Sequence, residues 1–198
     1  MSSVDYISHG PALMYIAAVG TALPADTVGA GTAWGGAWTQ IGWTESAIKL
    51  TYEYAVAAAR IQETLADVAR WKSEESLNWE TTLAEVTMTN VQYAIEGSVA
   101  VTAPGASPVH GTSVLALGGS DLLTVRAWGF EWNEYIASVS QPIRVLVYRG
   151  TASAGIVLEG GKDKQSVVAL KGTALADMTQ SQGSRLFKIY HITAEPSS

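Results

Sequence analysis

Histidine is the side chain most often used for acid–base chemistry and metal binding near neutral pH, and this sequence has three. His9, His110 and His191 stand far apart, and no two of them share a metal-ligand spacing. His110 lies among Pro and Gly residues, which favours a surface position, whereas His191 lies in an alternating strand pattern, which favours a structural role. Cysteine is absent, which excludes thiolate metal sites, thiol nucleophiles and disulfides.

Other motifs of catalysis or cofactor binding are also missing. The glycine pairs at 118–119 and 160–161 lack the Gly-Lys-Ser/Thr ending of a phosphate loop, and Gly-x-Ser-x-Gly does not occur. The neighbouring acids at 74–75, and Glu131 with Glu134, are predicted to be solvated surface residues. We therefore expect no enzyme activity, no catalytic or metal-binding residues and no cofactor.

Composition points to one domain that assembles with copies of itself. The chain has 198 residues, 47% of them hydrophobic and only 15% charged, with a formal net charge of -6. Typical domains carry about 25% charged residues, so we expect surface to be buried between copies. The acidic balance argues against a sequence-reading DNA-binding protein. No apolar run approaches the ~18 residues of a spanning helix, and no basic signal region is present, so we expect no membrane insertion by this chain.

The pattern of elements predicts a mainly β (α+β) fold. Residues 1–37 are expected to form an N-terminal arm and loop, with one short strand over 13–19, because the glycines at 29–36 oppose a helix. Residues 38–198 are expected to form a single β domain, an antiparallel β-sandwich or barrel. Alternation of apolar and polar residues predicts two partner strands, over 48–56 and 77–83.

The rest of the chain adds one helix and further strands. A short flanking α-helix is expected over 88–96. Thr87 or Thr89 can cap its start, Thr89 with Gln92 fits a capping box, and Gly97 ends it. Residues 97–120 contain several Pro and Gly residues and are expected to be a loop. The remaining strands are expected at 122–131, 143–149, 165–171 and 185–192.

Residues 57–73 favour two different structures. The segment is rich in Ala, Gln, Glu, Leu and Arg, which are good helix formers. Its position between two paired strands favours an extended segment instead. We expect a strand that continues to about residue 62, followed by a long inter-strand loop.

The order and spacing of several segments resemble the major tail protein (tail tube protein) of long-tailed, siphovirus-type bacteriophages. The resemblance covers about residues 38–192, and no single motif in it is diagnostic. The sequence departs from the family pattern at 55–59, where alanines replace more polar and acidic residues. The segments that carry it are 41–45 (IGWTE), 48–53 (IKLTYE), 61–68 (IQETLADV), 83–87 (LAEVT), 145–149 (VLVYR), 174–178 (ALADM) and 186–189 (LFKI).

The resemblance implies a structural protein of the virion tail, assembled in the host bacterial cytoplasm. Copies would form hexameric rings that stack into a hollow tube and conduct DNA from the capsid to the host. Its partners would be other copies, the tail tip and tail terminator proteins, the tape measure protein and then double-stranded DNA, without specific binding. Head-to-tail contacts propagate naturally as such a filament.

Two sets of residues are the candidate sites of such a tube subunit. Nine of the chain's acidic residues but only four basic ones lie in 45–96, and an acidic wall would repel DNA instead of binding it. The arm 1–35 and the segment 57–73 are the candidates for contact between rings. The lumen-facing candidates are Lys49, Glu53, Asn78, Glu80 and Thr82. The inter-ring candidates are Ile61, Leu65, Val68, Arg70 and Trp71.

Two other functions compete with this interpretation. A tube subunit of a contractile or phage-derived injection particle would share the fold. A carbohydrate-binding β-sandwich module could use the cluster Trp34, Trp38 and Trp43 as a stacking platform. Tryptophans also fill cores and subunit interfaces, where aromatic side chains are enriched.

Overall fold

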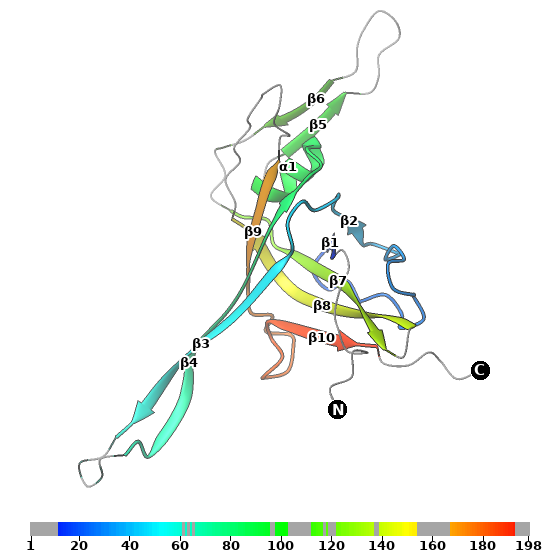
Figure 1. Cartoon of the computed structure of the whole chain (residues 1–198). Coiled ribbons are helices and arrows are strands. Elements are labelled where there is room, and N and C mark those ends of the chain that lie inside the picture. Colours follow the sequence, from blue (N-terminus) through cyan, green and yellow to red (C-terminus); the bar gives the residue numbers. More distant parts are fainter. Residues whose placement is uncertain are drawn as a thin grey trace, which may run out of the picture.

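The computed structural model describes residues 12–60, 62, 64, 66–95, 98–102, 112–116, 118, 122–136, 139–153 and 167–192. Within them the fold is mainly β, with one large antiparallel sheet and one short helix (Figure 1). This confirms the predicted fold class, although the sheet is not closed into a barrel within one chain.

The large sheet has the strand order β2-β1-β7-β8-β9-β4-β3, and β10 pairs with β8. Strand β8 pairs with β7 along most of its length and with β10 at residues 143–147. Its last residues, 150–152, pair with β9. The strands are β1 (Leu13–Ala17), β2 (Thr39–Gln40), β3 (Lys49–Ala59), β4 (Ala69–Leu83), β7 (Arg126–Ile136), β8 (Val139–Ala152), β9 (Val168–Ala174) and β10 (Phe187–His191).

The main hydrophobic core lies on one face of this sheet, where α1 (Met88–Ile95) also contributes Val91 and Ala94. Trp79 is buried in this core beside the rings of Trp128 and Phe130, and it pairs with Gly172 of the next strand, β9. A Cβ atom on Gly172 would stand only 2.1 Å from Trp79 Cζ2, so glycine is required for this packing. The helix begins and ends within a residue of the predicted bounds.

A second, smaller core covers the opposite face of β1, β7 and β8. Trp34 and Trp38, which follow the glycine-rich segment, pack there against Tyr15 and Leu146. Strand β1 lies between β2 and β7 in the sheet. The described part of the N-terminal segment, from residue 12, is therefore packed against its own chain.

Two predicted loops contain strands. The expected long loop within 57–73 is largely the end of a β-hairpin, because β3 continues to Ala59 and β4 already begins at Ala69. This hairpin extends well beyond the rest of the sheet (Figure 1). The expected loop 97–120 contains a second hairpin formed by β5 (Ser98–Thr102) and β6 (Thr112–Ala116). In both places backbone pairing overrides the local composition.

Candidate functional site

One exposed face of strands β3, β4 and β9 carries a row of polar side chains. Residues at alternate positions of a strand point to the same face, and the strand register aligns these positions: Glu80 of β4 stands between Lys49 of β3 and Lys171 of β9. All five predicted lumen-facing residues are brought together in this row. We define the polar strip as Lys49, Thr51, Glu53, Ser76, Asn78, Glu80, Thr82, Lys171 and Thr173.

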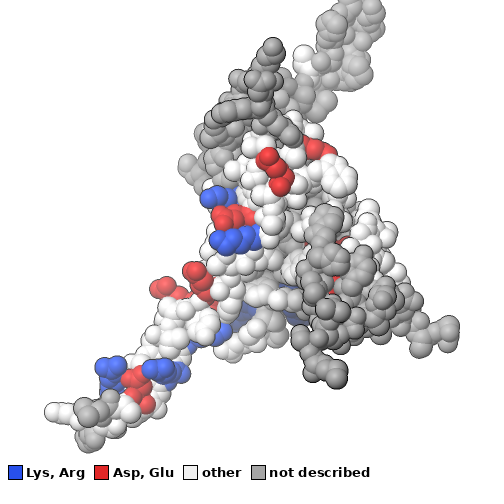
Figure 2. Space-filling model, viewed as in Figure 1, with Lys and Arg blue, Asp and Glu red and all other residues white. Residues whose placement is uncertain are grey.

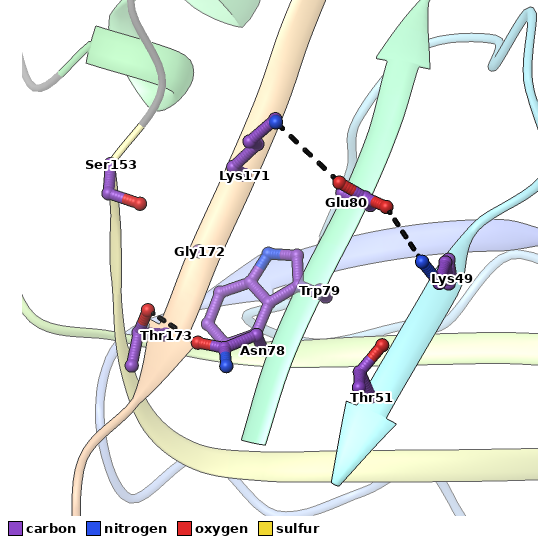
Figure 3. A pocket seen from close by; sticks show the side chains of 9 residues that line it. All are labelled: Lys49, Thr51, Asn78, Trp79, Glu80, Ser153, Lys171, Gly172 and Thr173. Atoms are coloured by element: carbon purple, nitrogen blue, oxygen red, sulfur yellow. Dashed lines mark hydrogen bonds and ion pairs between the residues drawn. The ribbon is translucent and has the colours of Figure 1, made fainter. Parts of the chain in front are cut away.

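Glu80 lies between two ammonium groups at the end of the polar strip that is nearest the rest of the sheet, which we call the body end. Its carboxylate oxygens are 3.2 Å from Lys49 Nζ and 3.6 Å from Lys171 Nζ (Figure 3). The hydrogen bond from Lys49, together with the charges of both lysines, holds the pKa of Glu80 below its ordinary value. The Thr173 hydroxyl donates to Asn78 Oδ1 at 2.8 Å. The residues around Glu80 line an open hollow of about 320 Å³.

The charge of this face changes along its length. At the body end, two lysines compensate Glu80, and one of them, Lys171, comes from a distant part of the sequence. Farther along the hairpin, Glu53 and Glu74 border a hollow of about 270 Å³ that no Lys or Arg lines. Figure 2 shows mixed charge near the root of the hairpin and acidic side chains farther along it. On this face, Glu53 and Glu74 therefore make the outer half more acidic than the end that holds Glu80 and its two lysines.

The outer half of the β3–β4 hairpin has no strand neighbour in the part of the chain that the structure describes. Strand β9 pairs with β4 only at residues 78–83, and β3 is the last strand of its sheet. Every residue of β4 from 69 to 75 is exposed. A free strand edge of this length is a template for pairing with another chain.

A β-bulge redirects the side chains at the end of the hairpin. The β3–β4 register shifts once, because β4 contributes the additional residue Ser73. Lys72 consequently lies on the face opposite the polar strip, where its ammonium donates to the Tyr52 hydroxyl at 2.9 Å. Trp71 then pairs with Ala57 and lies on the same face as the polar strip, with 53% of its surface exposed.

Three charged residues gather at the tip of the hairpin. Asp67 accepts hydrogen bonds from Arg60 Nε at 2.7 Å and from Arg70 Nε at 2.9 Å. These two bonds hold the pKa of Asp67 below its ordinary value. The Asp67 side chain is only 14% exposed, whereas those of Arg60 and Arg70 are 76% and 71% exposed. The guanidinium groups therefore dominate the accessible surface of these three residues.

The structure describes three of the five predicted inter-ring residues. Val68, Arg70 and Trp71 are all exposed near the tip of the hairpin. Ile61 and Leu65 lie outside the described residues, as do residues 1–11 of the predicted arm.

Two of the three tryptophans proposed as a carbohydrate platform are buried. Trp34 stacks on Tyr15 with ring centroids 4.3 Å apart, and Trp38 meets Trp34 edge-on at 5.1 Å. Trp43 alone of the three is exposed, at 63%. This burial removes the stacking surface on which the carbohydrate-binding interpretation depended.

A buried ion pair anchors the N-terminal loop to the sheet, and sequence reasoning missed it. Glu131 of β7 and Arg144 of β8 lie opposite each other at 2.8 Å, and each side chain is 1% exposed. Glu131 also accepts hydrogen bonds from Trp34 Nε1 at 2.8 Å and Gly31 N at 3.0 Å. The prediction that Glu131 is solvated is therefore wrong, because a loop about 100 residues away in the sequence covers it.

Glu134 was also predicted to be solvated, and it too is buried. Its Oε2 atom lies 2.6 Å from Nε2 of His191 in β10, an ion pair whenever His191 is protonated. His191 lies in a strand, as its alternating sequence pattern predicted.

No group of three or more His, Asp or Glu side chains in the described ranges could hold a metal ion. None of the described helical residues form a helix long and apolar enough to cross a membrane. No protein-family model matches the chain, and no curated protein matches it in sequence.

Proposed function

We propose that this chain is the structural subunit of a bacteriophage tail tube. Copies close into hexameric rings, and the rings stack into a hollow tube that conducts DNA from the capsid to the host. In this proposal the protein acts in the virion tail, is assembled in the host cytoplasm, and meets the tail tip, tail terminator and tape measure proteins as well as its own copies.

The observation that carries the proposal is the β3–β4 hairpin. It extends beyond its own sheet, and its outer half has free edges and two exposed faces. A two-stranded ribbon is at best marginally stable alone in water. A neighbouring copy would supply the missing contacts, as subunit packing does in a stacked tube.

The open sheet supports ring formation by the same reasoning. Strand β3 is the last strand of the sheet, and its outer edge has no partner strand in the described ranges. Unpaired edges of this kind promote association between chains. Joining the sheets of six copies edge to edge would cover these edges. Because the contact joins two different surfaces, it closes as a ring or continues as a filament.

The polar strip is the proposed lining of the channel. DNA slides past a wall that offers few unpaired cations, because phosphate binding is driven by release of counterions from the nucleic acid. Lys49 and Lys171 both lie beside Glu80, and the acids Glu53 and Glu74 dominate the outer half. Such a surface would retain water and would not hold the duplex.

Negative-stain electron microscopy of the purified, concentrated chain tests the proposal. We expect six-fold rings or hollow tubes. A variant in which residues 60–68 are replaced by Asn-Gly, which suits a two-residue hairpin turn, should stay folded but not stack. Wild-type protein that remains monomeric at high concentration, or a shortened variant that forms normal tubes, would contradict the proposal.

A further inference from the structure

The β-bulge divides the β3–β4 hairpin into two parts. Val56 pairs with Lys72, and Ser73 beside it has no partner on β3. An extra residue of this kind interrupts the ladder and bends its strand. Beyond the bulge the ribbon has two strands and no third neighbour in the described ranges, so little backbone pairing opposes bending there. We call the part of β3 from Val56 outward, together with the part of β4 up to Lys72, the distal hairpin.

The distal hairpin has contacts of its own at the tip. Val68 N donates a hydrogen bond to Ala59 O at 2.9 Å. Asp67 accepts hydrogen bonds from Arg60 at the end of β3 and from Arg70 of β4. These contacts join the two strands to each other and not to the rest of the sheet, so we expect the distal hairpin to move as a unit.

The side chain of Lys72 reaches back across the bulge on the face opposite the polar strip. Its ammonium lies 4.9 Å from the centroid of the Tyr54 ring and 5.4 Å from that of Tyr52. It donates to the Tyr52 hydroxyl at 2.9 Å and lies 3.1 Å from Glu75 Oε1. All three contacted residues lie between the bulge and the rest of the sheet. Hydrogen bonds to Tyr52 and Glu75 raise the pKa of Lys72 above its ordinary value, so the ammonium is charged at neutral pH.

Tyr52 is in turn held by the rest of the sheet. Its ring packs against Phe187 at the start of β10, with ring centroids 5.5 Å apart. Beside this contact lies an open hollow of about 460 Å³, whose lining includes Tyr52, Glu75 and residues 182–187. Open space therefore adjoins the face on which Lys72 lies, and it leaves the hairpin room to bend toward β10.

We propose that the β3–β4 hairpin is a hinged arm that bends at the Ser73 bulge, and that Lys72 is the latch that holds it extended. While Lys72 rests on the rings of Tyr52 and Tyr54, the distal hairpin keeps one orientation relative to the sheet. When these contacts open, it swings toward the hollow beside β10. The inference concerns the free chain and is independent of the proposed function.

The latch is built from exposed contacts, so it opens and closes readily. The side chains of Lys72 and Glu75 are 49% and 42% exposed, and the Tyr54 residue is 55% exposed. Exposed ion pairs and cation–π contacts are individually weak. An arm that is already latched is pre-organised for any surface that binds it, because less ordering remains for the moment of association.

Distances between spin labels test the hinge, and the chain has no cysteine of its own. Labels at A69C and I189C stand on opposite sides of the bulge, one at the outer end of β4 and the other on β10. Both residues are exposed. Double electron–electron resonance on dilute, monomeric chains should give one narrow distance distribution when Lys72 is present.

K72M removes the charge and keeps an unbranched apolar side chain. Loss of two exposed cation–π contacts should shift the ratio of bent to extended hairpins about five- to thirtyfold toward the bent form, seen as a second, shorter distance. Y52F, which removes only the hydroxyl that Lys72 binds, should give a smaller shift. K72R should keep the narrow distribution, because a guanidinium also stacks on aromatic rings and pairs with carboxylates.

The matched control is K49M, since Lys49 lies on the opposite face of the hairpin and on the other side of the bulge from the distal hairpin. Circular dichroism should show that all variants remain folded. A broad distribution with Lys72 in place, an unchanged distribution in K72M, or an equal shift in K49M would overturn the latch. Because each measurement is made on monomers, tube formation by the wild-type chain is a separate result that tests only the proposed function.

Discussion

Replacing Glu131 by glutamine should strongly destabilise the folded chain. The amide keeps the shape of the side chain and one acceptor for Trp34, but it removes the charge that faces Arg144. The arginine remains 1% exposed, with loop carbonyls as its other hydrogen-bond partners. Breaking a buried pair in this way leaves an uncompensated charge in the protein interior.

The cost follows from that burial. Loss of one member of a buried ion pair costs about 3–5 kcal/mol. In a chain of this size each 1 kcal/mol lowers the Tm by about 2–4 °C, so E131Q should lower the Tm by about 6–20 °C. The double variant E131Q/R144M should be more stable than E131Q, because it also removes the stranded charge.

Denaturant and thermal unfolding, at a concentration where the chain is monomeric, measure these differences. The matched control is K49M, which breaks the exposed pair between Lys49 and Glu80 and should change the Tm little. Limited proteolysis should also show faster cleavage in the N-terminal loop of E131Q than in that of the wild type. The reasoning would be refuted if E131Q stayed within about 1 kcal/mol of the wild type.

Two further predictions concern the core. Gly172→Ala places a Cβ atom 2.1 Å from Trp79 Cζ2, so denaturant unfolding should show a loss of about 1–3 kcal/mol, and wild-type stability would mean that Trp79 packs elsewhere. Burial raises the pKa of Tyr15 to about 12. Because the folded state favours the neutral phenol, the contribution of Tyr15 to the free energy of unfolding is complete below pH 10 and is lost as the pH rises toward 12. Ultraviolet titration should show one tyrosine ionising last, and Y15F should lack that step and its alkaline loss of stability; an unchanged titration curve in Y15F would contradict the assignment.

Local patterns in the sequence were sufficient for most of the regular elements. Alternation identified the strand pair that forms the inner parts of β3 and β4, and a 3.6-residue period identified α1. Of the two cap candidates, Thr87 is the one whose Oγ1 accepts a hydrogen bond from Asn90 N, at 3.1 Å. The β5–β6 hairpin was missed, although Ser98–Thr102 alternates, because its Pro- and Gly-rich surroundings favoured a loop.

The hairpin shows where local propensity fails. Alanines at 57–59 favour a helix in isolation, yet each of them pairs with a residue of β4. The antiparallel pairing of β3 with β4 begins at Lys49 and Glu80 and continues to Ala59 and Ala69. Each further pair of residues extends a hydrogen-bonded ladder that is already formed, and this favours the strand over the helix. The bulge at Ser73, which decides that Trp71 and not Lys72 shares the face of the polar strip, has no signal in the composition of the segment.

The sequence by itself determined the class of fold, the main strands, the helix, and the polar alternation that gathers Lys49, Glu53, Asn78, Glu80 and Thr82 on one face. These features depend on periods of two or 3.6 residues, which neighbours along the chain are enough to specify. Tertiary structure alone decided which charges are buried or compensated. Glu131 is covered by a loop about 100 residues away, and Glu80 gains a second lysine from β9. Burial and electrostatic partners are long-range properties, because they depend on which distant segments the folded sheet brings into contact.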